Sequence, residues 1–125
     1  MPSSKKTILV IEDDPVLAVM YKTKLEAEGY EIVSATNGVE GLSSAKQCKP
    51  DLILLDIILP QLDGFSVLEE LKDDAKTKKI PVVLLTNLGT DEDREKGQKL
   101  GAVDYLVKAN YTPEQISSEI KKFIK

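Results

Sequence analysis

The sequence predicts an α/β fold in which helices cover both faces of a parallel sheet. Segments typical of strands alternate five times with segments typical of helices, and three of the strand segments are continuous apolar runs. Such runs are expected of strands covered on both faces, and the alternation favours right-handed crossovers. A length of 125 residues, 42% of them hydrophobic, suits a single domain over residues 1–125 with one core.

The predicted strands cover residues 7–12, 31–35, 52–56, 82–86 and 103–107. In the third of these, Asp56 follows a run of Leu and Ile. An unpaired charge buried among apolar groups is so unfavourable that the group usually neutralises instead. We therefore place Asp56 at the tip of its strand and residues 57–60 in a loop.

Helix signals lie between the strands. Asp14 precedes Pro15, as a cap precedes a first-turn proline, and Thr90 precedes three acidic residues that suit a helix N-terminus. Residues 37–40 and 112–115 have the pattern of capping boxes. Gly29 and Gly101 stand where helices should end.

Charge and composition exclude several functions. A net charge of -4 and a pI near 4.9 have the wrong sign for gripping phosphates, which predicts no direct binding to nucleic acid. No apolar run approaches the roughly 18 residues of a membrane span, and no signal-peptide core follows the basic start. We therefore predict no membrane insertion and a cytoplasmic location. A single Cys48 and no His exclude an internal disulfide, His-based zinc sites and His general-base chemistry.

Chemically capable residues end or follow four of the predicted strands: Glu12, Asp13, Asp56, Thr86 and Lys108. Ligands of such sheets bind beyond the carboxyl ends of the strands. Clustered carboxylates need a cation, and oxygen ligands without His or thiol favour Mg²⁺. A hydroxyl and an ammonium suit phosphoryl oxygens, so the site suits phosphoryl transfer to a carboxylate nucleophile. The alternative is that these acids are helix caps or solvated loop residues, as we expect for Asp14.

Four segments in combination resemble the receiver domain of two-component response regulators. They are ILVIEDDP at the first strand, DLILLDIILPQLDG at the third, PVVLLTN at the fourth and GAVDYLVK at the fifth. The resemblance covers residues 6–124. It implies a flavodoxin-like, doubly wound sheet of strand order 2-1-3-4-5 flanked by five helices.

The resemblance also implies a phosphorylation and metal site. Asp56 would be the phospho-acceptor and, with Asp13, a direct ligand of Mg²⁺. Glu12 would act on the metal largely through water, and the backbone carbonyl of Ile58 would complete the ligands. No organic cofactor is expected.

Further family roles fall on Thr86 and Lys108, which would bind phosphoryl oxygens, and on Tyr105, the aromatic switch that turns inward when Thr86 moves. Two residues depart from the family pattern. Ala109 replaces a proline that is usually joined to the lysine by a cis bond, and a non-proline cis bond costs about 2.5 to 4 kcal/mol, which bears on the placement of Lys108. Asn87 is larger than the usual Ala or Ser and could narrow access to the acceptor.

Ile58 and Leu88 hold the two family positions that flank the water attacking an aspartyl phosphate. Both are apolar and cannot hydrogen-bond that water, which predicts slow self-dephosphorylation. Gly64, in the PxxDG loop, is expected at a backbone position with φ > 0.

The first helix carries two apolar stripes. Leu17, Tyr21 and Leu25 should face the sheet. The second stripe consists of Val16, Val19, Met20 and Thr23. We interpret it as a docking surface for the phosphodonor, which meets this helix in the receiver family; the alternative is a broader core contact with the neighbouring helix.

The sequence is thus interpreted as a stand-alone receiver domain without an output domain, and the starting Met and a last helix expected to run to Lys125 favour a complete chain over one cut from a longer protein. It would take a phosphoryl group from a histidine kinase or histidine phosphotransfer protein and alter its contacts with a target protein. We do not expect a conventional enzyme, because the domain would catalyse its own Mg²⁺-dependent phosphorylation and slow dephosphorylation. A haloacid dehalogenase-type phosphatase would want an acid where Ile58 stands, and a flavin carrier's phosphate would be repelled by residues 12–14. A degenerate receiver that acts only through protein contacts is the remaining alternative.

Overall fold

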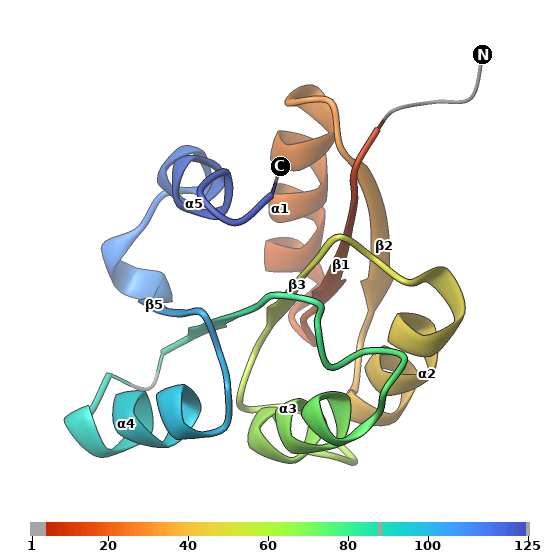
Figure 1. Cartoon of the computed structure of the whole chain (residues 1–125). Coiled ribbons are helices and arrows are strands. Elements are labelled where there is room, and N and C mark those ends of the chain that lie inside the picture. The colour runs from red at the N-terminus through yellow and green to blue at the C-terminus, as the bar shows by residue number, and fades with distance from the viewer. Residues whose placement is uncertain (1–4, 88, 125) are drawn as a thin grey trace.

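The structure is a computed structural model that describes residues 5–87 and 89–124. Its centre is a five-stranded parallel sheet of order β2-β1-β3-β4-β5 (Figure 1). The strands are β1 (Thr7–Ile11), β2 (Glu31–Ala35), β3 (Leu52–Leu55), β4 (Val82–Thr86) and β5 (Asp104–Val107). The order expected from the resemblance is therefore confirmed.

Five α-helices flank the sheet in two layers (Figure 1). The helices on one face are α1 (Pro15–Ala27) and α5 (Pro113–Ile120). Those on the other are α2 (Gly38–Cys48), α3 (Gly64–Asp73) and α4 (Asp91–Lys99). A short 3₁₀ helix, Lys108–Asn110, connects β5 to α5. No helix in the described part of the chain is both long and apolar enough to cross a membrane.

The core forms one layer on each face of the sheet. Ile8 and Val10 of β1 pack with α1 and α5, whereas Leu9 and Ile11 pack on the opposite side. Because neighbouring side chains of a strand point to opposite faces, a strand covered on both sides must be apolar at every position. This explains the continuous apolar runs in the sequence.

Three strand ends differ by one residue from the prediction, because β1 ends at Ile11, β3 ends at Leu55 and β5 begins at Asp104. The ladder nevertheless continues briefly past two of these ends. The amide of Asp56 donates to the carbonyl of Ile11 at 3.1 Å, and the amide of Glu12 donates to Ala35 at 3.0 Å. The last hydrogen bonds of the sheet therefore hold the residues that follow the strands.

The helix signals are largely confirmed. Asp14 caps α1 by accepting hydrogen bonds from the amides of residues 16 and 17, and Thr112 forms the predicted capping box of α5. Gly29 and Gly101 adopt φ of 98° and 103° after helix ends, a conformation open to glycine. Of the two hydrogen bonds of the capping box predicted at residues 37–40, one is confirmed and the other is wrong. Asn37 accepts from the Glu40 amide, but the Glu40 carboxylate accepts from the amide of Thr36, which the extended backbone at Asn37 leaves within its reach.

Candidate phosphorylation site

Glu12 and Asp56 lie side by side at the carboxyl edge of the sheet. Ile11 pairs with Leu55 between β1 and β3, so the next residue of each strand reaches the same place. Both acidic residues are buried, with exposed fractions of 2% and 6%. Two carboxylates in such surroundings require a positive partner.

Lys108 supplies that partner. Its Nζ lies 2.6 Å from Oε1 of Glu12 and 2.7 Å from Oδ2 of Asp56. Burial raises the pKa of the Glu12 carboxyl, and the hydrogen bond from Lys108 opposes that rise. Burial would lower the pKa of the Lys108 ammonium, but its bonds to Asp56 and Glu12 raise the pKa above its ordinary value. The ammonium therefore stays charged at neutral pH. The bond between Lys108 and Ala109 is trans, and this departure from the family pattern leaves the lysine in contact with both acids.

Asp13 completes an acidic cluster that fits a hard cation. One oxygen each from Glu12, Asp13 and Asp56 lies within 4.8 Å of the others, and Asp13 is exposed where the other two are buried. An all-oxygen set without thiol or imidazole is the donor chemistry that Mg²⁺ prefers. Asp14 is engaged differently, since one of its carboxylate oxygens caps α1. The residues present therefore fit a Mg²⁺ ion.

An open cleft of about 270 Å³ gives access to these groups. It is lined by Glu12, Asp13, Asp14, Leu17, Asp56, Ile58, Thr86, Asn87 and Lys108. Thr86 ends β4 and is fully buried, whereas Asn87 is exposed at the rim. A larger hollow of about 430 Å³ lies beside Lys46 and Asp74, so it is the convergence of acids, hydroxyl and ammonium that distinguishes the cleft. The five residues that the sequence predicted at the strand ends all line it.

The loop after β3 brings a backbone group to the cleft. The Ile58 amide donates to Oδ1 of Asp56 at 3.2 Å, and the Ile58 side chain is 58% exposed. The expectation of φ > 0 at Gly64 is wrong: the positive value in this loop, 71°, belongs to Gln61. Gly64 is needed for a different reason, because a Cβ at this position would collide with the carbonyl of Asp56 and with Ile57.

Of the two remaining predicted residues, Tyr105 and Leu88, the structure describes only Tyr105. Tyr105 is buried in β5, 7% exposed, on the sheet face covered by α4. Arg94 of α4 lies over its ring. Sequence reasoning did not single out Arg94. The signal available in the sequence was an arginine three positions before a glycine, in a helical segment without large apolar residues. Leu88 lies outside the described residues.

The two stripes of α1 separate as the sequence predicts. Tyr21 and Leu25 are buried, and Leu17 packs against the same cluster. The residues of the second stripe are all exposed: Val16 (67%), Val19 (62%), Met20 (42%) and Thr23. A broader core contact with the neighbouring helix therefore does not account for the second stripe in this structure.

Comparison with known proteins places the chain among signalling domains. The profile described as response regulator receiver domain matches residues 8–121. The DNA-binding dual master transcriptional regulator RpaA of Synechocystis is 39% identical over 118 residues, which cover 94% of this chain and 48% of that protein. The chain spans about half the length of the first curated relatives that it matches.

Solved structures agree with this match. Chemotaxis protein CheY4 of Vibrio cholerae has a TM-score of 0.90 at 26% identity, covering 97% of this chain and 100% of that chain. The receiver domain of sensor histidine kinase PA1611 from Pseudomonas aeruginosa was solved with a magnesium ion coordinated in its active-site cleft. It has a TM-score of 0.86 at 28% identity, covering 96% of this chain and 98% of the other.

Proposed function

Because this chain belongs to the family of response regulator receiver domains, we propose that it accepts a phosphoryl group from a phosphohistidine donor on Asp56. Phosphorylation would then change its contacts with a target protein. One observation carries the assignment of the acceptor: the Asp56 carboxylate reaches the cleft with one oxygen on the Lys108 ammonium and the other on the Ile58 amide. The acceptor is thus oriented by two donors.

The transfer is a displacement at phosphorus. A carboxylate oxygen of Asp56 forms the new oxygen–phosphorus bond as the phosphorus–nitrogen bond of the donor breaks, and the electron pair leaves with the imidazole. The Lys108 ammonium and the Thr86 hydroxyl would hold the other phosphoryl oxygens. Both residues line the cleft beside the acceptor.

Mg²⁺ belongs to the proposal as the bound cation. Asp13, Asp56 and the carbonyl of Ile58 would hold it, with Glu12 acting largely through water. When bound, Mg²⁺ supplies positive charge that offsets the repulsion between the acidic residues and a phosphoryl group. The acidic cluster and the magnesium in the similar PA1611 receiver support this part.

The switch proposed for this domain links Thr86 to Tyr105. Thr86 is the last residue of β4 and lines the cleft. Leu84, two residues earlier on the same strand, pairs with Tyr105 between β4 and β5. A shift of Thr86 toward a phosphoryl group would alter the space beside Tyr105 and α4. This movement would change the surface that contacts the target protein.

The exposed stripe of α1 is the proposed docking surface for the donor. Val16, Val19 and Met20 present apolar surface on the helix that begins beside Asp13 and Asp14. A histidine kinase or histidine phosphotransfer protein that covers this stripe would bring its phosphohistidine to the cleft. Exposed apolar patches next to a reactive site are typical of protein contacts.

The degenerate alternative is not supported, because every functional group that the chemistry needs lines the cleft. The acidic net charge keeps direct nucleic-acid binding outside the proposal for this chain. RpaA, named as DNA-binding, is about twice as long as the matched region. A cytoplasmic location stays a prediction.

The test is incubation with Mg²⁺ and acetyl phosphate, followed by intact mass measurement. We expect the wild type to gain one phosphoryl group and Asp56→Asn to gain none, because an amide is a poor nucleophile. Asp91→Asn, the same change at an exposed residue of α4, should be labelled like the wild type. Equal labelling of Asp56→Asn would overturn the assignment.

A further inference from the structure

Helix α4 has an unusual composition for a helix packed on a sheet. Its nine residues, DEDREKGQK, include no large apolar side chain, and Gly97 is its one buried residue. Helices in this position normally attach through an apolar stripe. Within these nine residues, α4 therefore attaches to the sheet without such a stripe.

Contacts of Gly97 and Arg94 with the sheet converge on Tyr105. A Cβ built on Gly97 would lie 3.4 Å from Cδ2 of Tyr105 and 2.6 Å from Cδ1 of Leu84, so the helix backbone lies close against both side chains there. Arg94, one turn earlier, places its guanidinium carbon 5.2 Å from the centre of the Tyr105 ring. Its Nη1 also donates to the Tyr105 carbonyl at 3.4 Å.

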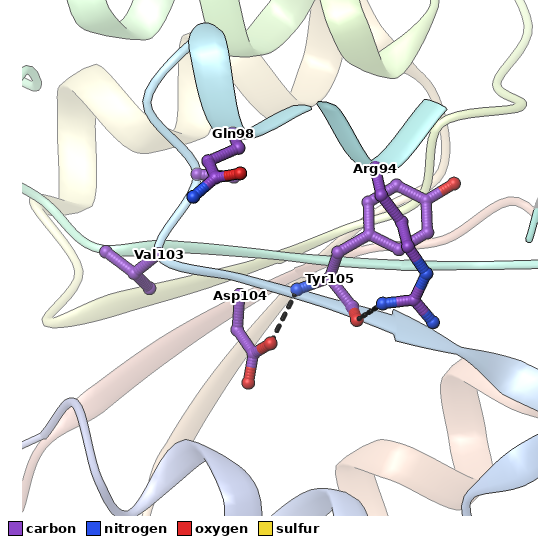
Figure 2. Close-up of a pocket in the computed structure, with 6 residues that line it drawn as sticks. Arg94, Gln98, Val103, Asp104 and Tyr105 are labelled. Carbon is purple, nitrogen blue, oxygen red and sulfur yellow. Dashed lines mark hydrogen bonds between the residues drawn. The ribbon is translucent and has the colours of Figure 1, made fainter. Parts of the chain in front are cut away.

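Figure 2 shows the Arg94 side chain reaching across the Tyr105 ring. Beside them is a hollow of about 290 Å³ that Gln98, Val103 and Asp104 also line. An open hollow next to the ring leaves space into which a tyrosine side chain can turn. A cation over an aromatic face is attractive, more so for arginine because its flat group stacks on the ring.

We propose that Arg94 is a positioning residue that holds the Tyr105 ring in its buried position and thereby couples α4 to the switch. This inference rests on the proposed role of Tyr105. Arg94 touches neither the acceptor nor the cleft. It sets how far the ring and the helix move together when Thr86 shifts.

The same helix offers a matched control. Nζ of Lys96 lies 4.5 Å from the centre of the Phe65 ring on α3. Lys96→Met therefore removes the same charge from α4, and also a cation–ring contact, but not the contact with Tyr105. Arg94→Lys keeps a cation for the ring and loses the flat guanidinium, so its effect should be intermediate.

The experiment labels the four tyrosines with 3-fluorotyrosine and follows them by fluorine NMR without phosphodonor. Tyr105→Phe assigns the Tyr105 signal, and the difference in its shift between light and heavy water reports exposure. We expect Arg94→Met to raise the exposed population of Tyr105 about threefold, the factor that a weak cation–ring contact is worth. Lys96→Met should leave this signal in place.

An Arg94→Met protein whose Tyr105 signal and exposure match the wild type would overturn the proposal, as would an equal change in Lys96→Met. The proposed function is tested separately by the mass of the same proteins after acetyl phosphate and Mg²⁺. Arg94→Met should still be phosphorylated on Asp56. A wild type that gains no phosphoryl group would contradict the proposed function, whereas the exposure of Tyr105 in the fluorotyrosine-labelled protein before phosphorylation decides the role of Arg94.

Discussion

Nζ of Lys108 lies 2.7 Å from Oδ2 of Asp56, although 52 positions separate the two residues in the chain. The same ammonium lies 2.6 Å from Glu12. One cation thus serves two buried carboxylates that come from different strands. Lys108 therefore stabilises the sheet edge in addition to its proposed role in binding phosphoryl oxygens.

Lys108→Met should destabilise the fold at neutral pH, because it leaves two buried acids without a partner. Breaking a buried ion pair costs about 3 kcal/mol or more. Burial raises the pKa of Glu12 above 4.5, so the folded state prefers the protonated acid, and the lysine's absence enlarges this preference. The loss of stability caused by Lys108→Met should therefore be largest at pH values above the pKa of Glu12 in the folded protein, and it should shrink as the pH falls toward 4.5. Urea unfolding at several pH values measures it.

Lys121→Met is the control for that experiment. Lys121 bonds the exposed Glu28 at 3.0 Å, and surface pairs of this kind contribute little. A Lys108→Met protein as stable as Lys121→Met at neutral pH would show that the buried acids do not depend on the lysine.

Asp13→Asn should weaken Mg²⁺ binding by about tenfold or more, since even the loss of a residue that only orients a metal ligand costs that much. Without Mg²⁺ the variant should be slightly more stable, because one of three clustered negative charges is gone. Calorimetric titration and thermal melts in chelator measure the two effects. Asp14→Asn, which keeps an oxygen to cap α1, should lose less affinity. A variant at position 13 that is clearly less stable without metal would argue against a shared acidic pocket.

Gly64→Ala should destabilise the fold by about 2 kcal/mol, the usual cost of forcing an extra carbon into a packed site. The added Cβ would meet the backbone of Asp56 and Ile57, so Mg²⁺ affinity should fall as well. At Gly89 the nearest heavy atom to a Cβ is 3.5 Å away, and Gly89→Ala should lie within about 0.5 kcal/mol of the wild type. Chemical denaturation compares them, and equal stability of the two variants would contradict the close-approach argument.

Self-dephosphorylation should be slow in the wild type. Ile58 is exposed at the cleft and offers no polar side-chain group to an attacking water. Replacing Ile58 by Asn and Leu88 by Glu together should speed the loss about tenfold, equivalent to about 1.4 kcal/mol of barrier. The phosphorylated mass is followed over time after the donor is removed, at fixed Mg²⁺. If both proteins lose phosphate at one rate, the side chains at these positions do not shield the site.

Local signals in the sequence were sufficient for the strands and for several helix ends. The apolar runs predicted strands to within one residue, and Asp14 and Thr112 were identified as caps because a helix start is specified by a few adjacent residues. The position of Asp56 at a strand tip also followed from the sequence, since a carboxylate is disfavoured inside an apolar strand. The candidate site was predictable to this extent because parallel strands bring their carboxyl ends to one edge.

Tertiary structure alone decided how distant residues meet. The sequence could not show that Lys108 bonds Glu12 as well as Asp56, or that Gly64 is required by the backbone of Asp56 rather than by a positive φ. Nor could it show that Arg94 lies over Tyr105. Capping and strand formation depend on neighbours along the chain, whereas these contacts depend on how helices and loops pack against the sheet, and that packing is set by the whole core at once.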